Sequence, residues 1–313
     1  MEEQADNAIE KSKESLPILI SFLILAIFVL VLPILVNEYA KFYKNSSAAL
    51  STASVVVGNV SPVASGSALN GGNAITLTEN TTTSIAATGT VTDDNGCLDL
   101  VSVGVAVYKD GTTCEDAGDA DNNNCYYWTD SAPDENASCT GGSDTTYALN
   151  YSFNIQYYAD PGTWKVTVTP ADSGAGTPTT SSGVTLNDLQ ALAVSETITY
   201  GSVSNGASST GDHTATVTNT GNTAIDFKVS GADLACSVVG SIPKSSEQYS
   251  LASFSYGDGT VLSATPTDVN ADLAARTSES VPVTDTTYWQ VNVPNGVSGT
   301  CSGAVTFTAE AAL

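Results

Sequence analysis

The chain has 313 residues, with 9 Lys and Arg against 33 Asp and Glu, one His and six Cys, and its formal net charge is −24. This acidity argues against a nucleic-acid partner, because phosphate binding needs a surface rich in Lys and Arg. The single His argues against a His-based metal enzyme. Only 13% of the residues are charged, which excludes a disordered charged tail, and the abundance of Ser, Thr, Asn, Gly and Val is typical of secreted all-β proteins.

The first element is an apolar run, Leu16–Val36, of 21 residues without a charge. As a helix it extends for about 32 Å, enough to cross a hydrocarbon core of about 30 Å. The alternative is a cleaved signal peptide, but the apolar region of a signal peptide has only about 7–15 residues and a small-residue cleavage site close behind it. We therefore predict an uncleaved transmembrane helix with its interfacial end over residues 16–44, preceded by a cytoplasmic head over residues 1–15.

The flanking charges do not decide the orientation of this helix, because Lys11 and Lys13 precede it and Lys41 and Lys44 follow it. All six cysteines lie beyond the helix, and paired cysteines in small β domains indicate an oxidising compartment. We therefore expect a single-pass protein with a cytoplasmic N-terminus and its C-terminal domains on the cell surface. Five N-x-S/T sequons also follow the helix and are either glycosylation sites or chance matches: Asn45, Asn59, Asn80, Asn136 and Asn150.

After the helix the composition changes twice. Residues 45–70 are rich in Ser, Ala, Val and Gly and predict a stalk with one short apolar strand over 54–60. From residue 71 onward, runs of alternating apolar and polar residues are separated by Asn-Gly, Asp-Gly and Pro-Gly turns, and no amphipathic helix of ordinary length interrupts them. We expect strands over 74–79, 83–92, 100–108, 147–157, 163–170, 191–200, 213–219, 224–230, 249–256, 287–293 and 303–310.

A Gly-, Ser-, Thr- and Pro-rich segment over 171–187 divides these strands into two series of sandwich size. The predicted fold class is therefore all-β: two tandem Ig-like β-sandwich domains, over 71–187 and 188–313, on a single N-terminal transmembrane helix. Trp164 is expected in the core of the first domain, and Trp289 and Phe227 in the core of the second.

Two stretches of the second series resemble a domain of known surface proteins: AVSETITYGSVSNGASSTGDHTATVTNTGNTAIDFKVSGADLAC and YWQVNVPNGVSGTCSGAVTFTA. In the first series, ALNGGNAITLTENTTTSIAATGTVTDDNGC, NNNCYYW and GTWKVTVTPADSG resemble the Ig-like domain that precedes it there. The family is that of exported Ig-like β-sandwich surface proteins of ultra-small candidate-phylum (Patescibacteria-type) bacteria. The resemblance covers about residues 54–313 and implies a surface location but no catalytic residues. The uncleaved-looking helix with its cytoplasmic head departs from that pattern.

The six cysteines divide four to two between the domains. Pairing within domains leaves only Cys236–Cys301 for the second domain, whereas three arrangements remain for the first. We favour Cys114–Cys125 as a local link and Cys97–Cys139 across the insertion. Zinc bound by four thiolates is the alternative, but zinc sites usually contain C-x₂₋₄-C pairs, and none occurs here.

Acidic residues concentrate between Asp93 and Asp144, where 12 carboxylates accompany one Lys. Within this stretch, oxygen-bearing side chains recur at short intervals, and Ca²⁺ is bound by six to eight such oxygens. The candidate Ca²⁺ ligands are Asp116, Asp119, Asp121 and Asn123. A weaker candidate site is the Asp93-Asp94-Asn95 run at a strand end. The fixed Gly and distal Glu of an EF-hand are missing, so the alternative is a solvated acidic loop enclosed by two cysteines.

No catalytic motif is present: the chain lacks a P-loop, G-x-S-x-G and H-E-x-x-H. His213 begins a strand and is interpreted as a surface histidine, so we expect no enzyme. The aromatic run Tyr126–Trp128 could face a glycan, although the core side of a strand is the favoured interpretation.

These observations favour a membrane-anchored structural protein of the cell surface, a subunit of a surface layer or other self-associating envelope array with Ca²⁺ as candidate counterion. One alternative is a pilin-like filament subunit, because Asn37–Lys41 after the apolar helix is similar to type IV pilin N-termini, although no Gly-Phe-type processing site precedes it. A further alternative is an adhesin that binds a glycan or a neighbouring cell surface through Tyr126–Trp128 and the acidic loop.

Overall fold

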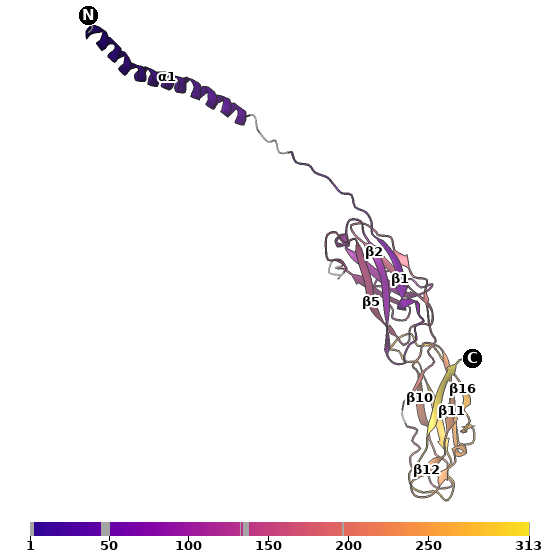
Figure 1. The fold of residues 1–313 in the computed structure, drawn as a ribbon. Coiled ribbons are helices and arrows are strands. Elements are labelled where there is room, and N and C mark those ends of the chain that lie inside the picture. Colours follow the sequence, from indigo (N-terminus) through magenta and orange to yellow (C-terminus); the bar gives the residue numbers. More distant parts are fainter. Residues whose placement is uncertain (1–2, 45–50, 132, 134–137, 196, 313) are drawn as a thin grey trace. The chain divides into compact units, whose positions relative to one another are not determined.

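The computed structural model describes residues 3–44, 51–131, 133, 138–195 and 197–312. Helix α1 spans Glu3–Lys44 and has Pro17 and Pro33 in its interior (Figure 1). An 18-residue window within Pro17–Phe42 has a mean hydropathy of 3.3, and no residue of that stretch is buried in the protein. The apolar helix predicted from the sequence is thus confirmed as a helix long enough to cross a membrane. It begins at Glu3, inside the stretch predicted as a separate cytoplasmic head.

Residues 51–62 contain neither helix nor strand, so the strand predicted over 54–60 is wrong. Val55, Val56 and Val57 are 84%, 95% and 75% exposed. Valine favours a strand only where a neighbouring backbone can pair with it and a surface can cover its side chain. The first strand is instead β1 (Val63–Leu69), which lies within the predicted stalk and pairs with β2.

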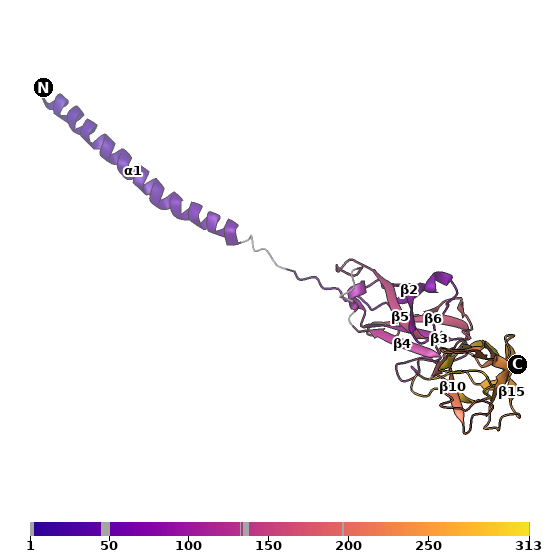
Figure 2. The ribbon, with the colours of Figure 1, turned by 90° about the horizontal axis from the view of Figure 1, so that it is seen from below.

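The first sandwich consists of two antiparallel sheets (Figures 1 and 2). One has the order β1-β2-β5, with β2 at Thr82–Thr92 and β5 at Thr146–Gln156. The other has the order β4-β3-β6-β7, and β8 also pairs with β6. Its strands are β4 (Cys125–Asp130), β3 (Ser102–Lys109), β6 (Gly162–Ala171), β7 (Thr179–Thr180) and β8 (Val184–Leu186). The strand predicted over 74–79 is reduced to a single bridge between Ile75 and Leu186.

The core of the first sandwich forms from the inward-facing residues of these strands. Trp164 on β6 is fully buried, as predicted, and its indole Nε1 donates a 2.8 Å hydrogen bond to the Asp160 carbonyl oxygen. Tyr147 and Ile155 on β5 are also buried. Alternation along β5 and β6 places every second residue in this core. The period-two pattern in the sequence therefore corresponds to the two faces of each sheet.

The second sandwich repeats the plan with five- and three-stranded sheets, in the orders β15-β14-β17-β10-β9 and β16-β11-β19. Trp289 and Phe227 are fully buried between them, as predicted. The strands of the larger sheet are β9 (Leu192–Ser195), β10 (His213–Asn219), β14 (Glu247–Ser250), β15 (Thr260–Val261) and β17 (Thr284–Val291). Those of the smaller sheet are β11 (Ile225–Gly231), β16 (Thr267–Leu273) and β19 (Val305–Ala311). The fold class is thus all-β after the helix, as predicted.

Three disulfides form in these domains, two in the first and one in the second. They join Cys97 to Cys139, Cys114 to Cys125 and Cys236 to Cys301, the pairs that the sequence favours. The last one links two short paired strands, β12 (Leu234–Cys236) and β18 (Cys301–Ser302), which form a small sheet with β13 (Ser241–Ile242). No cysteine is free. This leaves no thiolate for the zinc alternative.

The two sandwiches meet at Asn222, a fully buried residue of the loop between β10 and β11. Its side-chain Nδ2 donates hydrogen bonds to the carbonyl oxygens of Ala159, at 2.9 Å, and Asn187, at 3.2 Å. Its Oδ1 accepts a 2.6 Å hydrogen bond from the Leu189 backbone N–H. Arg276 adds a cation–π contact, 5.3 Å from the ring centre of Tyr157. Residues 59–313 accordingly form one compact unit.

Candidate functional site

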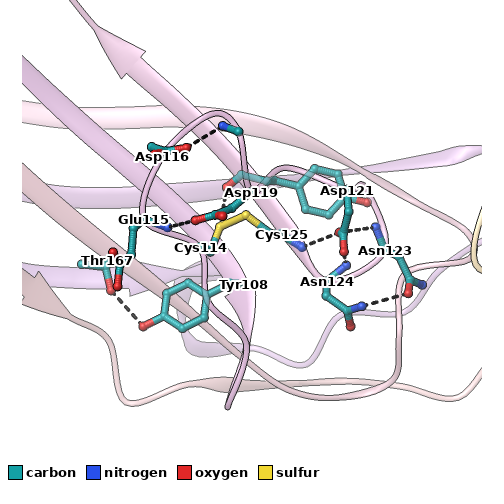
Figure 3. Close-up of a disulfide and its surroundings, with 12 residues drawn as sticks. Tyr108, Cys114, Glu115, Asp116, Asp119, Asp121, Asn123, Asn124, Cys125 and Thr167 are labelled. Atoms are coloured by element: carbon teal, nitrogen blue, oxygen red, sulfur yellow. Dashed lines mark hydrogen bonds between the residues drawn. A yellow bond between two sulfur atoms is a disulfide. The ribbon is translucent and has the colours of Figure 1, made fainter.

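The loop between Cys114 and Cys125 holds three of the predicted Ca²⁺ ligands in hydrogen bonds to its own backbone (Figure 3). Asp116 Oδ1 accepts from the Gly118 N–H at 2.6 Å, and Asp119 Oδ2 from the Glu115 N–H at 2.7 Å. Such contacts are typical of Asp residues that stabilise turns.

Asp121 is the central residue of this loop. Its Oδ1 accepts hydrogen bonds from the backbone N–H groups of Asn123, Asn124 and Cys125, at 2.9, 2.6 and 2.9 Å. Burial opposes ionisation, but these hydrogen bonds prevail and lower the pKa of the Asp121 carboxyl. The side chain therefore acts as a fixed acceptor that closes the turn into β4.

The fourth predicted ligand, Asn123, links the loop to a neighbouring segment, and its Oδ1 accepts a 2.9 Å hydrogen bond from Asn124 Nδ2. Asn123 Nδ2 donates to the Tyr158 carbonyl oxygen at 2.6 Å and to Asp160 Oδ1 at 3.3 Å. Among the described residues, the carboxylates of Asp116, Asp119 and Asp121 do not converge within 4.8 Å of one another. The structure therefore does not assemble the predicted ligand set. Close spacing in sequence does not bring these side chains together, because one oxygen of each carboxylate is already bonded to a nearby backbone N–H.

The carboxylates that do converge belong to Asp93, Asp99 and Asp172, and one oxygen from each lies within 4.8 Å of the others. Asp93 follows the last residue of β2, Asp99 ends the short 3₁₀ helix η2 (Cys97–Asp99), and Asp172 follows β6. The strands that carry Asp93 and Asp172 belong to opposite sheets, so the cluster bridges one end of the sandwich. We call these three residues the acidic cluster.

Two residues of the acidic cluster are buried, Asp93 at 1% exposure and Asp172 at 6%. Asp93 Oδ1 accepts a 2.8 Å hydrogen bond from the Asn95 N–H, whereas its Oδ2 is buried and has no hydrogen-bond partner among the described residues. Burial raises the pKa of the Asp93 carboxyl, the Asn95 N–H lowers it, and the neighbouring charges of Asp99, Asp172 and Asp94 raise it. The balance disfavours the ionised form of this carboxyl.

In contrast to Asp93, the Asp172 carboxyl is held in its ionised form. Its Oδ1 accepts a hydrogen bond from the Gly174 N–H at 2.6 Å, and its Oδ2 accepts one from Asn59 Nδ2 at 2.7 Å. These two hydrogen bonds lower the pKa of the Asp172 carboxyl. Of the weaker candidate site predicted from the sequence, Asp93 alone belongs to the acidic cluster. Asn95 Oδ1 instead accepts a 2.5 Å hydrogen bond from the Val60 N–H.

The second sandwich contains a cleft of about 1330 Å³ between the edge strands β9 and β19 and the chain over residues 197–205. Apolar side chains and Ser and Thr hydroxyls line it, and Glu247 reaches it from β14. Tyr200, on the strand-free segment, donates a 2.8 Å hydrogen bond from its hydroxyl to Glu247 Oε1. Burial raises the pKa of the Glu247 carboxyl, and burial together with the Glu247 charge raises that of Tyr200. The sequence offered no sign of this pair, because 47 positions separate its members.

The aromatic run Tyr126–Trp128 lies on β4 and packs mainly against protein. Tyr126 is buried beside Trp164, with 5.9 Å between ring centres. Trp128 stacks on Tyr151 of the opposite sheet, with 3.9 Å between ring centres. Tyr126 and Trp128 therefore lie on the core side of the strand, as favoured, whereas Tyr127 packs on the opposite face against the cluster of Ala106, Cys114 and Cys125.

His213 is half-buried at the start of β10. Its Nδ1 lies 2.9 Å from the Thr199 carbonyl oxygen, and its ring contacts Tyr200 edge-on with 5.2 Å between centres. Among the sequons, Asn59, Asn80 and Asn150 are exposed. Asn45 and Asn136 lie outside the described residues.

No protein-family model and no curated protein matches the chain. Among solved structures, it is similar to the C-terminal domain of the Streptococcus agalactiae AgI/II polypeptide BspA, with 13% identity over 79% of this chain and 95% of that one and a TM-score of 0.22. It is also similar to the C-terminal domain of the Streptococcus pyogenes antigen I/II-family protein AspA, with 13% identity over 80% and 96% of the two chains and a TM-score of 0.24. Scores of this size do not define a common topology.

Proposed function

We propose that the protein is a membrane-anchored structural protein of the cell surface. The observation that carries the proposal is the stretch Pro17–Phe42, which has no buried residue although an 18-residue window within it has a mean hydropathy of 3.3. So large an apolar surface is stable in hydrocarbon and unstable in water.

The three disulfides support an exterior position for the sandwiches, because such bonds persist in oxidising compartments. The segment over residues 51–62, which contains neither helix nor strand, then separates them from the membrane. In this arrangement residues 1–15 are cytoplasmic.

Lateral self-association into a surface layer or other envelope array is the finer part of the proposal. The chain carries a net charge of −24, so crowded copies repel each other unless cations lie between them. Strands at the edges of the sheets, such as β4 in the first sandwich, offer backbone groups for contacts between copies. Filament assembly would use the same parts with α1 as the shared core.

The topology is tested by labelling intact cells with an amine reagent that cannot cross membranes and mapping modified lysines by mass spectrometry. We expect labelling of Lys228 and Lys244 and protection of Lys11 and Lys13 until the cells are permeabilised. Labelling of Lys11 and Lys13 in intact cells would contradict the orientation. Loss of the peptides around Lys11 and Lys13 from the native protein would instead identify a processed N-terminus, as a pilin requires.

The assembly is tested by cryo-tomography of the native envelope. A lattice supports the array, filaments support the pilin-like alternative, and dispersed particles contradict both.

One observation favours a second candidate function, a binding module. The cleft between β9 and β19 combines apolar and hydroxyl-bearing side chains with the buried Tyr200–Glu247 pair, and a few polar groups among apolar ones are common in ligand sites. Glycan-array binding that Val203→Trp abolishes would support this function, with Val238→Trp as the control, since Val238 is 70% exposed and does not line the cleft. Equal binding by both variants would place any glycan site elsewhere.

A further inference from the structure

We propose that the acidic cluster, Asp93, Asp99 and Asp172, is a Ca²⁺ site at the end of the first sandwich where the chain enters it. The residues over 59–61, 93–99 and 171–174 meet there through the bonds that Asn59 and Val60 make. The site is distinct from the loop between Cys114 and Cys125.

The spacing of the oxygens fits one shared ion. One carboxylate oxygen from each residue lies within 4.8 Å of the others. Protein oxygens bind Ca²⁺ at about 2.3–2.6 Å, so two ligands of the same ion are at most about 5 Å apart. All three carboxylates can therefore reach a single cation without a rearrangement of the backbone.

The buried Asp93 side chain is the second, independent observation. Asp93 is 1% exposed, and its Oδ2 has no hydrogen-bond partner among the described residues. A buried polar oxygen without a partner destabilises a fold by about 1–3 kcal/mol, and by more when the group is charged. A cation bound to Oδ2 supplies the missing interaction, while Oδ1 keeps its bond to the Asn95 N–H.

The charges around the cluster favour a bound cation. Within the described part of the chain, every Lys that forms an ion pair does so with other carboxylates, and none pairs with Asp93, Asp99 or Asp172. Three carboxylates at this separation repel each other strongly when two of them are buried. A divalent ion reverses this repulsion.

The ligands are also held in place before the ion arrives. Gly174 and Asn59 fix the Asp172 carboxylate, the Asn95 N–H fixes that of Asp93, and the Cys97–Cys139 disulfide anchors the 3₁₀ helix that ends at Asp99. Such supporting hydrogen bonds orient the metal ligands and raise the affinity of the site for the metal ion. Asp99 is exposed, so water can complete the coordination sphere.

The chemistry of the ligand atoms favours Ca²⁺ over other metal ions. It consists of oxygen atoms alone, which suit hard cations and not zinc or copper. Mg²⁺ demands a near-ideal octahedron at about 2.0–2.1 Å, whereas Ca²⁺ accepts irregular sets of six to eight oxygens. The inference does not depend on lateral association, because one chain supplies all three residues.

The test uses the purified full chain in detergent, treated with EGTA, dialysed and titrated with CaCl₂ by isothermal calorimetry. We expect one ion per chain with a dissociation constant of about 0.1–1 mM or tighter, as in other extracellular calcium modules. Absence of binding at about 10 mM calcium, or equally tight binding of Mg²⁺, would overturn the assignment.

The variants Asp99→Asn and Asp172→Asn are expected to weaken binding by at least about tenfold. Asp99 is exposed and makes no side-chain hydrogen bond within the described residues, so we expect Asp99→Asn to fold normally. If Asp172→Asn fails to fold, the calcium affinity of Asp99→Asn alone tests the site. Asp116→Asn is the matched control, because it removes the same charge from the other acidic segment and should leave binding unchanged. An equal loss in Asp116→Asn and Asp99→Asn would show diffuse charge attraction and no site.

Discussion

The hydroxyl of Tyr200 donates a 2.8 Å hydrogen bond to Oε1 of Glu247, whose side chain is 1% exposed in the second sandwich. The other oxygen, Oε2, is buried and has no hydrogen-bond partner among the described residues. Among the described residues, Tyr200 therefore provides the only side-chain hydrogen bond to the Glu247 carboxyl. Two predictions follow from this pair.

Tyr200→Phe removes the hydroxyl and leaves Glu247 buried without a side-chain donor. We expect the free energy of unfolding to fall by about 1–3 kcal/mol, measured by urea denaturation. Adding Glu247→Leu to Tyr200→Phe should restore much of the loss, because an apolar pair leaves no unsatisfied group. If the double variant instead loses a further ~1–3 kcal/mol of unfolding free energy relative to Tyr200→Phe, the two residues do not act together.

The stability contributed by Glu247 should depend on pH. Burial raises the pKa of its carboxyl above the ordinary value of 4.5, so the folded protein holds a proton that the unfolded chain releases. The contribution is fully present below about pH 4.5 and is lost as the pH rises through the folded pKa. We expect the stability difference between the wild type and Glu247→Gln to shift against the wild type from pH 4.5 to pH 8. A difference independent of pH would contradict the raised pKa.

The Asp121 carboxylate should stabilise the first sandwich through its three backbone hydrogen bonds. Asp121→Ala is expected to cost about 1 kcal/mol, a modest value because the residue is exposed and solvent screens its charge. Asp116→Ala removes a single bond to Gly118 and serves as the control with a smaller effect. Since the pKa of Asp121 is lowered, its contribution is present above the unfolded pKa and disappears as the pH falls through the folded one. Equal denaturation midpoints for both variants would refute this role.

Removal of the two disulfides with the most different loop lengths should separate their effects. Cys236–Cys301 joins residues 65 apart, and Cys114–Cys125 joins residues 11 apart. Loop-closure entropy predicts losses of about 4 and about 3 kcal/mol for the respective Cys→Ser pairs. Urea denaturation of the two double variants provides the comparison. A larger loss for the shorter loop would mean that packing of the fully buried Cys125 outweighs the entropy of the unfolded chain.

The parts of the fold that repeat a local pattern could be predicted from the sequence. The alternation over 213–219 predicted β10 with the bounds that the structure has, and the apolar run after Leu16 predicted a helix. The prediction failed at Val55–Val57, where β propensity is high but no strand pairs with the chain. It also missed β1, because its residues VASGSAL are mostly small and their place in the sheet depends on β2.

The acidic cluster could be predicted only in part. The sequence indicated Asp93 as the first residue of a candidate site. Asp172 lies 79 positions further along the chain and meets Asp93 only because β2 and β6 end at the same edge of the sandwich. At Asp116, Asp119 and Asp121 the density of acidic residues in sequence indicated a site, whereas in the structure one oxygen of each bonds to the local backbone. Long-range convergence of side chains is a property of the topology, which a single sequence does not display.

The contacts of Asn222 have a consequence for the order in which the chain folds. The carbonyl groups that accept from its amide belong to Ala159 and Asn187, which are synthesised before it. The first sandwich can therefore be complete before the loop that carries Asn222 exists, whereas the second acquires this buried bond only by folding against a neighbour already in place. During biosynthesis the first sandwich thus acts as a template, and a defect in it should slow the maturation of the second.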